Sequence, residues 1–165
     1  MMKKMCIIMA FVLASPATAQ NSPSYDETVR FVTSKVAAVD GSVRFSLTFP
    51  NRCVMRTRDE HLRSSGSTSS LSVRSTHLGE LDPSRIDVSS FKTVSLYTRE
   101  DMKRVATSQR NFAKSGAFDP TFSFSGGHNL IFIRVLSGQD NENGNRVARA
   151  MRHLIDICGG KEELF

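Results

Sequence analysis

The chain contains no tryptophan, only two tyrosines and three cysteines, and none of the short motifs that mark common enzymes. A phosphate-binding glycine loop, a dinucleotide-binding fingerprint and a Gly-x-Ser-x-Gly nucleophile turn are all missing from the sequence. The four histidines lack the spacing of metal ligands on one helix face, and no Cys-x-x-Cys pair accompanies them: they are His61, His77, His128 and His153. The sequence therefore predicts no metal site, no cofactor and no recognisable catalytic residues.

Long apolar segments are also scarce, and the single run, residues 5–14, follows the opening Met-Met-Lys-Lys. Ala17 and Ala19 stand behind it at the small-residue positions of a secretory cleavage site. As a helix the apolar run would extend only about 15 Å, roughly half the thickness of a bilayer core. The pattern therefore predicts a signal peptide over residues 1–19, cleaved after Ala19, and a single exported domain over residues 20–165.

Export would place the mature chain in the periplasm or the medium, and loss of Lys3 and Lys4 would lower its formal charge from +6 to +4. Cys6 is removed as well, so Cys53 and Cys158 remain as the only cysteines. An oxidising compartment favours a disulfide between them, and a closed loop of about 100 residues contributes about 4.7 kcal/mol in the chain-entropy treatment. Two buried free thiols are the alternative, and a catalytic thiol lacks a supporting histidine motif.

Two helices are predicted at the ends of the mature chain. Ser24 and Glu27 have the spacing of a capping box, and valines at alternating three- and four-residue steps predict a helix that continues to Gly41. A second amphipathic helix is expected from an N-cap at Asn145, with Gly159 as the left-handed residue that ends it. Its broad apolar stripe requires a large partner surface, and a sheet is the candidate for that surface.

Short segments with strand character fill the chain between these helices. Six of them are recognised by composition or alternation: 42–49, 52–58, 70–76, 86–88, 93–98 and 129–137. The segment 119–129 predicts a hairpin that turns at Gly126 and Gly127 into 129–137, which is apolar on both faces and is expected at the sheet centre. Residues 99–114 fit either a helix or a strand. The prediction is an α+β fold with a mainly antiparallel curved sheet of six to seven short strands, an N-terminal helix and a packed C-terminal helix.

The two ends of the chain carry a resemblance that bears on the fold. The stretches RVARAMRHLIDICGGKEELF and SYDETVRFVTSKV are similar to those of small exported bacterial proteins of unknown function with a terminal HLIxxCGG-type helix. The order of short strands followed by one helix resembles a pleckstrin-homology-like architecture. The resemblance covers mostly the two ends and includes no catalytic motif, so it implies a fold and no activity.

Charge gives the one positive indication of a partner. Arg56 and Arg58 share one face of a predicted strand, and Arg146 and Arg149 form a basic stripe on the last helix. Guanidinium groups match carboxylates and phosphates, so these arginines predict an anion-binding surface for lipid headgroups or an acidic polymer. The alternative is a solvated face that maintains solubility. Nucleic acid is not an expected partner, because the chain is predicted to be exported and has no tryptophan for base stacking.

Two functional hypotheses follow from these features. The first is an exported binding or interaction module without catalysis, whose partner is an anionic surface or another exported protein. The second is a small secreted hydrolase-type enzyme or effector whose site forms only in the tertiary structure, with His128 or His61 as the base. An open basic or apolar patch would favour the module, whereas a histidine beside a carboxylate and a hydroxyl in a pocket would favour the enzyme.

Overall fold

The computed structural model describes residues 22–89, 92–136 and 142–159, and within these ranges the chain forms an α+β fold. The larger of two antiparallel sheets has the order β1-β2-β3-β4-β7-β8, with bounds Val39–Asp40, Val43–Asn51, Val54–Leu62, Thr68–His77, Val105–Phe112 and Phe118–His128. The smaller sheet has the order β5-β6-β9, with bounds Leu81–Ser89, Thr93–Thr98 and Leu130–Arg134. The helical segments are α1 (Tyr25–Ser34), η1 (Leu78–Glu80), η2 (Arg99–Asp101) and α2 (Glu142–Cys158). The α+β prediction is confirmed, with nine strands among the described residues.

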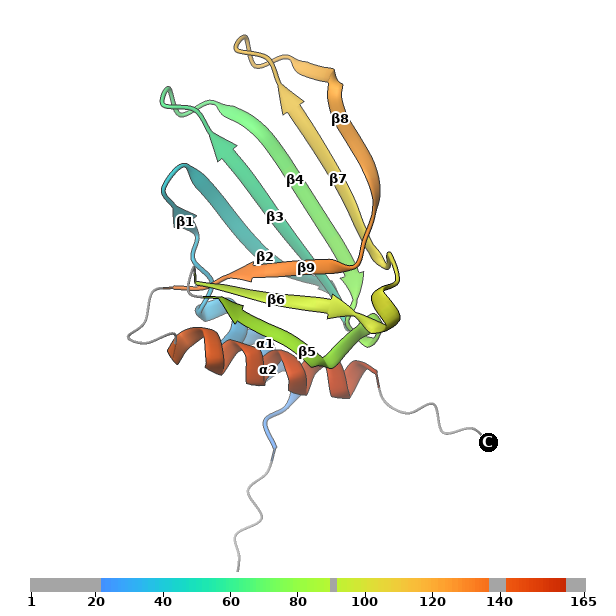
Figure 1. The fold of residues 1–165 in the computed structure, drawn as a ribbon. Helices are drawn as coiled ribbons and strands as arrows, with labels where there is room; N and C mark the ends of the chain where they lie inside the picture. The colour runs from blue at the N-terminus through green and yellow to red at the C-terminus, as the bar shows by residue number, and fades with distance from the viewer. Residues whose placement is uncertain (1–21, 90–91, 137–141, 160–165) are drawn as a thin grey trace, which may run out of the picture.

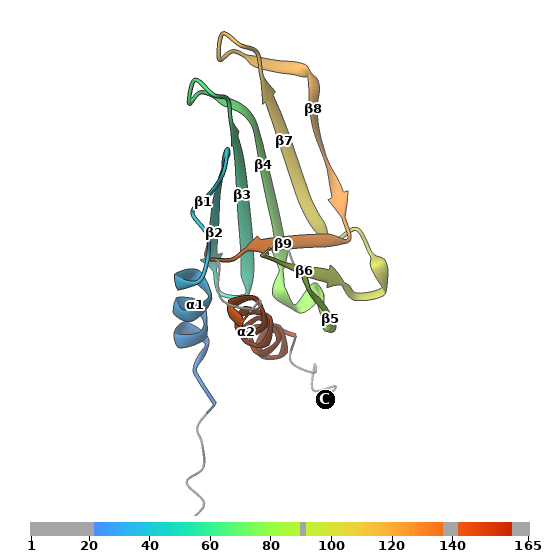
Figure 2. The same cartoon turned by 60° about the vertical axis from the view of Figure 1, so that its left-hand side comes forward.

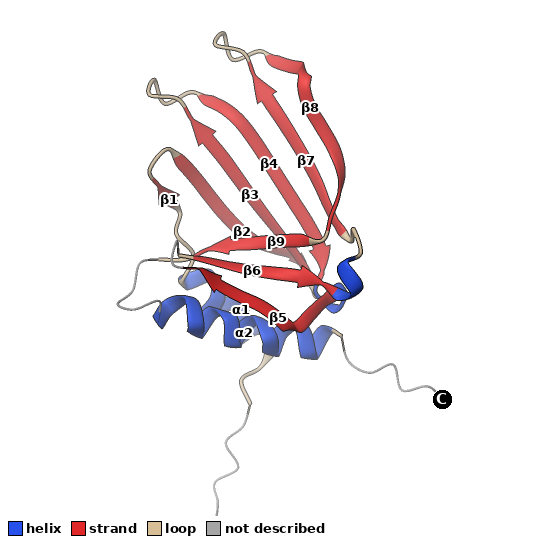
Figure 3. Ribbon diagram, in the orientation of Figure 1, coloured by secondary structure: helices blue, strands red, loops and turns tan. Residues whose placement is uncertain are grey.

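The two sheets lie across one another. Figures 1 and 2 show the long strands of the large sheet running away from the small sheet, whose strands cross their lower end. α2 packs on β5, and α1 lies beside α2, as the colours of Figure 3 make clear. We call the end of the large sheet near the small sheet its base, and the opposite end, with the turns at residues 63–67 and 113–117, its tips.

The apolar core is concentrated at the base. The register places Phe45, Leu47 and Met55 on the inner face of the large sheet, which is the face toward β9. They belong to one cluster with fully buried side chains of the small sheet and α2: Val94, Leu96, Ile131, Ile133, Met151, Leu154 and Ile155. Farther along β3 and β4 the same face carries His61 and Ser70. Apolar burial, the main favourable term in folding, therefore stabilises the base rather than the tips.

Helix α1 begins as predicted and ends earlier. The Ser24 hydroxyl accepts the N–H of Glu27 at 3.3 Å, and the Glu27 carboxylate accepts the N–H of Ser24 at 2.8 Å, which completes the capping box. The helix ends at Ser34 and does not reach Gly41. The following residues pair with strands instead, because Val36 forms a bridge to the residue after β9 and β1 pairs with β2. Backbone pairing thus overrides the helical spacing of the valines.

The predicted hairpin at Gly126 and Gly127 is wrong. Both glycines lie within β8, opposite Thr107 and Ala106 of β7, and the chain then passes to the small sheet, where β9 pairs with β6. A Cβ atom on Gly127 would lie 2.6 Å from the carbonyl oxygen of Lys103. This glycine therefore permits a close backbone approach and does not form a turn.

Strand β9 is at the edge of the small sheet and not at a centre. The order β5-β6-β9 leaves one long side of β9 without a strand neighbour in its own sheet, while β3 and β4 contact it from the large sheet. Both faces of β9 are apolar because other elements cover the strand on both sides. A central strand has the same burial pattern, so the sequence could not distinguish the two positions. Residues 99–114, which fitted a helix or a strand, form η2 and then β7.

The predicted disulfide is confirmed. The Sγ atoms of Cys53 and Cys158 are bonded at 2.04 Å, and their Cα atoms lie 5.5 Å apart. The Cys53 carbonyl oxygen also accepts the N–H of Leu78 at 2.7 Å. The turn between β2 and β3 is therefore attached to the end of α2 by a covalent bond and to η1 by a hydrogen bond.

Two details predicted for the last helix are wrong. The helix begins at Glu142, so Asn145 lies inside it and is not its N-cap; Gly144, in the first turn, is buried against β5 and allows the earlier start. Gly159 does not have a positive φ. A Cβ on Gly79 would lie 2.8 Å from the carbonyl oxygen of Cys158, the last residue of α2, and a Cβ on Gly159 would lie 3.5 Å from the Cα of Gly79. The glycines let the helix end approach η1 closely.

Candidate functional site

An arginine-rich surface forms on the outer face of the large sheet, which is the face away from β9. Directly opposite residues of antiparallel strands point to the same face. The register aligns one residue from each of four strands in a row: Arg44, Glu60, Leu71 and Arg110. Arg58 and Arg56 follow on β3 at two-residue steps toward the base, on the same face as Glu60. We call Arg44, Arg56, Arg58 and Arg110 the outer arginine face.

Glu60 is the only acidic side chain that the register places on this face among the described residues of β2, β3, β4 and β7. It lies 3.1 Å from Arg44 and 3.8 Å from Arg58, whose side chains remain 58% and 52% exposed. The Thr68 hydroxyl donates to Glu60 at 2.5 Å, and this bond, together with Arg44, holds the pKa of the Glu60 carboxyl below its usual value. Glu60 is therefore ionised at neutral pH, paired with Arg44 and Arg58, while Arg56 and Arg110 lie farther away on the same face.

The outer face is not flat. A hollow of about 480 Å³ is lined by Arg44 and Arg58, and a second of about 330 Å³ lies over β4 and β7 beside Arg110. At the tip, Phe118 is 54% exposed and stands opposite Phe112 in the register. Phe112 follows Arg110 by two residues along β7, so this aromatic pair is on the outer face as well. The surface combines cations, shallow depressions and an exposed ring.

The four arginines predicted to bind an anion lie on two different surfaces. Arg56 and Arg58 belong to the outer arginine face, whereas Arg146 and Arg149 are on α2, which packs against β5 and α1. The Arg146 guanidinium lies over the ring of Phe31, 5.3 Å from its centroid, and Arg149 lines a groove between α1 and α2. The anion-binding prediction itself remains a prediction for both pairs.

Two members of the outer arginine face were not among the arginines predicted to bind an anion. Arg110 lies in the segment that fitted a helix or a strand, and a strand reading would have placed it on one face with Ala106 and Ser108. Arg44 is visible as a charged residue in the sequence, but its position beside Arg58 depends on the pairing of β2 with β3. Register across strands, rather than spacing along one strand, assembles this surface.

A second charged cluster is buried on the inner face. Asp59 is 2% exposed and accepts hydrogen bonds from Nη1 of Arg74 at 2.8 Å and Nε of Arg134 at 3.3 Å. Phe132 lies under both guanidinium groups, with its ring centroid 4.5 Å and 5.6 Å from their central carbons, and it stacks on Phe45. Because Asp59, Arg74 and Arg134 come from β3, β4 and β9, the cluster links the two sheets.

Three hydroxyl groups near this cluster are buried without a hydrogen-bond partner among the described residues: Thr57, Ser72 and Thr107. Thr57 and Thr107 stand on either side of Arg74 in the register, and Ser72 precedes Arg74 by two residues on the same face. An unsatisfied buried hydroxyl costs about 1–3 kcal/mol. This part of the inner face is therefore less stable than an apolar surface of the same shape would be.

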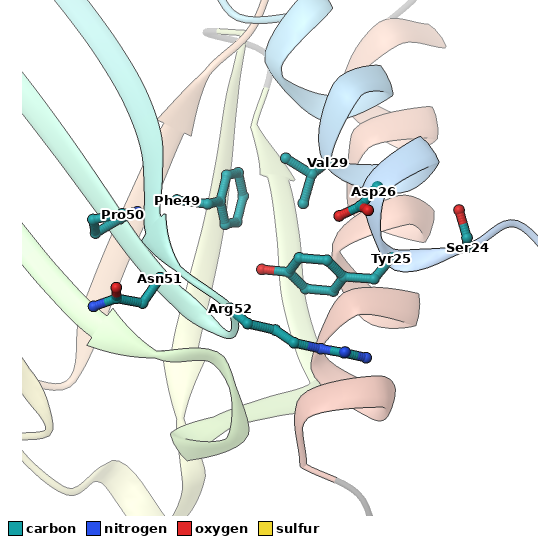
Figure 4. Close-up of a pocket in the computed structure, with 8 residues that line it drawn as sticks. All are labelled: Ser24, Tyr25, Asp26, Val29, Phe49, Pro50, Asn51 and Arg52. Atoms are coloured by element: carbon teal, nitrogen blue, oxygen red, sulfur yellow. The ribbon is translucent and has the colours of Figure 1, made fainter.

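A groove of about 490 Å³ lies between the first turn of α1 and the end of β2, as Figure 4 shows. Tyr25, Val29 and Phe49 form its apolar part, and Asp26 and Arg52 contribute opposite charges. It lies next to the disulfide, because Arg52 directly precedes the bonded cysteine of the turn. Neither of its charged residues was predicted from the sequence to bind a ligand.

The two histidines considered as bases lie at opposite ends of the large sheet. His61 is near the tip end of β3, whereas His128 ends β8 at the base. His77 accepts an N–H of η1 through Nδ1 at 3.2 Å, and Nε2 of His153 lies 2.7 Å from the carbonyl oxygen of Pro23. In the ranges that the structure describes, no group of three or more His, Cys, Asp or Glu side chains could hold a metal ion.

No protein-family model, curated protein or solved structure matches this chain. None of the helices in the described ranges combines the length and the apolar character that a membrane crossing requires. The disulfide favours a compartment outside the reducing cytosol. Beyond these findings, the functional argument depends on the geometry of the surfaces described above.

Proposed function

We propose that the chain is an exported binding module that holds an acidic polysaccharide on the outer arginine face. The observation that carries the proposal is the placement of Arg44, Arg58 and Arg110 on three strands of one face, where Glu60 is the single acidic side chain among the described residues of β2, β3, β4 and β7. Guanidinium groups pair with carboxylates through two parallel hydrogen bonds, which gives them geometric specificity as well as attraction. The exposed arginines supply such groups without any rearrangement of the sheet.

The geometry of a sheet favours a partner with repeated negative charges. Alternate residues along one strand are about 7 Å apart and neighbouring strands about 4.8 Å, so Arg56 and Arg58 are spaced along β3, Arg44 is one strand away and Arg110 two strands away. A polymer with one carboxylate per sugar can contact several of them at once, which multiplies the effect of individually weak surface pairs. The exposed Phe118 ring at the tip offers an apolar surface for a sugar ring.

The test compares two reversals of charge on different surfaces. Binding of the mature protein to polygalacturonate is measured by calorimetry at about 0.15 M salt for a variant with Arg58→Glu and Arg110→Glu, and for a matched control with Arg146→Glu and Arg149→Glu. The outer pair should weaken binding by about tenfold or more. The control makes the same change in net charge on α2 and should alter affinity less than about threefold, because salt screens distant charges. Equal losses would contradict the assignment to the outer face.

Two further measurements sharpen this test. Glu60→Gln removes the one repulsive charge on the face and should raise affinity by roughly twofold. Vesicles of an anionic phospholipid provide a second probe at matched charge concentration. If the vesicles bind as tightly as the polymer and show the same dependence on Arg58 and Arg110, the partner is a membrane surface and the polysaccharide assignment is wrong.

Export is part of the proposal. The apolar run of residues 5–14 with Ala17 and Ala19 behind it supports a cleaved signal peptide, and the Cys53–Cys158 bond supports an oxidising destination. N-terminal sequencing of the protein recovered from the periplasm or the medium should begin at Gln20. An uncleaved chain found only in the reducing cytosol would contradict export.

A further inference from the structure

The groove of Figure 4 has the size and the lining of a small-ligand site. Its volume of about 490 Å³ lies within the range of about 300–1,000 Å³ that such sites occupy. Tyr25 and Val29 of α1 form one wall, and Phe49 near the end of β2 forms the other. Figure 4 shows these three side chains turned toward the same space. Side chains from α1 and from β2 thus build one apolar floor.

The Tyr25 wall is held in place before any ligand binds. The Tyr25 hydroxyl oxygen accepts the N–H of Cys53 at 2.9 Å, and Cys53 is covalently bonded to Cys158 of α2. The Arg52 guanidinium lies over the same ring, 5.4 Å from its centroid. Because the ring and its neighbours are already ordered, a ligand that packs on them loses little binding energy to their immobilisation.

Two opposite charges border this apolar floor. Among the described residues, the Asp26 carboxylate has no hydrogen-bond or ion-pair partner, since Asp26 takes part only through its backbone oxygen, which accepts from Arg30. The Arg52 guanidinium contacts the Tyr25 ring and has no carboxylate partner within the described ranges. In the view of Figure 4 the Asp26 carboxylate lies above the Tyr25 ring, and the Arg52 side chain passes below it. The groove therefore presents one anion and one cation that a ligand can pair.

We infer that this groove binds a short peptide with free ends. The C-terminal carboxylate of the peptide pairs with Arg52, and its N-terminal ammonium group lies beside Asp26. An apolar side chain of the peptide packs against Phe49. A purely anionic ligand would be repelled by Asp26, and a purely apolar ligand would take both charged groups out of water without a partner. A molecule with both charges and an apolar body satisfies all three parts of the lining.

The probe is the tripeptide Ala-Phe-Ala, used with free ends, as its C-terminal amide and as its N-acetylated form. Binding to the mature, disulfide-bonded protein is measured by calorimetry and by chemical shift changes in NMR spectra. Wild-type protein should bind the amide and the acetylated form about fivefold more weakly or worse than the free tripeptide, because each modification removes one charge pair.

Two single variants assign each end of the peptide to a residue. Arg52→Gln should bind the free tripeptide and its amide equally while remaining sensitive to acetylation. Asp26→Asn should show the reverse pattern, with sensitivity to amidation alone. A variant that merely disturbs the fold would weaken all three forms together, so the pattern distinguishes recognition from structural damage.

The inference is overturned if wild-type protein binds the three forms equally, or if no form binds at millimolar concentration. It is also overturned if Arg52→Gln loses affinity for the free acid and the amide by the same factor. The variant with Arg58→Glu and Arg110→Glu should bind the free tripeptide as wild type does. Failure of peptide binding is therefore distinguishable from failure of polysaccharide binding on the outer arginine face.

Discussion

The turns at the base and at the tips of the large sheet are stabilised in different ways, although the same strands run through both ends. At the base, the turn between β2 and β3 contains Cys53, whose φ of 64° is unusual for a residue other than glycine, and a disulfide and a hydrogen bond from Leu78 hold it. At the tips, Gly66 and Gly116 have φ values of 80° and 86°, and a Cβ on either would meet no atom within 4 Å.

The inner and outer faces of the large sheet differ as well, and we propose that they separate stability from binding. Apolar side chains are buried on the inner face at the base, while the outer face carries solvent-exposed arginines from β2 to β7. Substitutions at the base should therefore lower the free energy of unfolding, and substitutions on the outer face should change affinity with little effect on folding. The following predictions test that separation, beginning with the largest expected effect.

Asp59→Ala should cause the largest loss of stability. It leaves Arg74 and Arg134 without the buried carboxylate that joins β3 to β4 and β9, and breaking such a pair costs about 3–5 kcal/mol. The measurement is urea unfolding of the purified protein. Asp87→Ala is the control, because Asp87 is exposed on β5 and its loss should cost less than about 0.5 kcal/mol. Similar midpoints for the two variants would refute the role of the cluster.

Loss of the disulfide should have the next largest effect. Replacing Cys53 and Cys158 together by serine should lower the free energy of unfolding by about 2–4 kcal/mol, because the unfolded chain is no longer constrained by a long loop. A reducing agent should lower the melting temperature of wild type and leave that of the double variant unchanged. A wild-type melting temperature that is insensitive to reduction would show that the bond does not stabilise the base.

Gly79→Ala should have a moderate effect. The added Cβ would lie 2.8 Å from the Cys158 carbonyl oxygen, so the end of α2 must shift away from η1, at a cost of about 1–3 kcal/mol. Gly126→Ala is the matched control, since nothing lies within 4 Å of its Cβ position, and it should leave stability unchanged or raise it slightly. Thermal unfolding of both variants distinguishes these outcomes.

Thr57→Val should raise stability by about 1 kcal/mol, because it replaces a buried hydroxyl that lacks a partner with a methyl group of similar shape. Thr48→Val, at an exposed position on the outer side of β2, should change little. Denaturant unfolding provides the comparison. A destabilised Thr57→Val protein would mean that the hydroxyl is hydrogen-bonded, for example to an internal water molecule.

Thr68→Val, near the tips, should have the smallest effect, at most about 1 kcal/mol. Because the Thr68 hydroxyl lowers the pKa of Glu60 in the folded chain, its contribution is present above the unfolded carboxyl pKa and is lost as the pH falls through the lower folded value. The difference between wild type and Thr68→Val should therefore be full at neutral pH, begin to shrink near the ordinary Glu pKa of about 4.3, and disappear only below the lower folded pKa of Glu60. A difference that does not change with pH would contradict the link to Glu60.

Local sequence patterns predicted a large part of the fold. Three of the confirmed features depend on residues that are close neighbours in the chain. They are the Ser24 capping box, the alternation of Phe45 and Leu47 in a strand, and the apolar stripe of the last helix. Predictions that depended on long-range pairing were less accurate. The first helix was expected to reach Gly41, and Gly126 was expected in a hairpin turn, because neither spacing nor composition shows which strands lie alongside.

The candidate sites show the same division. The sequence indicated Arg56 and Arg58 as one basic strand face, but Arg44 and Arg110 joined them only through the pairing of β2, β3, β4 and β7. The groove beside Tyr25 could not be predicted, since α1 and the end of β2 meet there through tertiary packing.

The amino-acid sequence alone determined which segments could be helix or strand, and it indicated Cys53 and Cys158 as the pair that remains if the predicted signal peptide is cleaved. The tertiary structure decided which arginines share a face, where the two sheets cross and which charges border the groove. The physical reason is the range of the interactions. Capping and alternation are satisfied by neighbours in the chain, whereas strand register and sheet crossing are set by contacts between residues tens of positions apart.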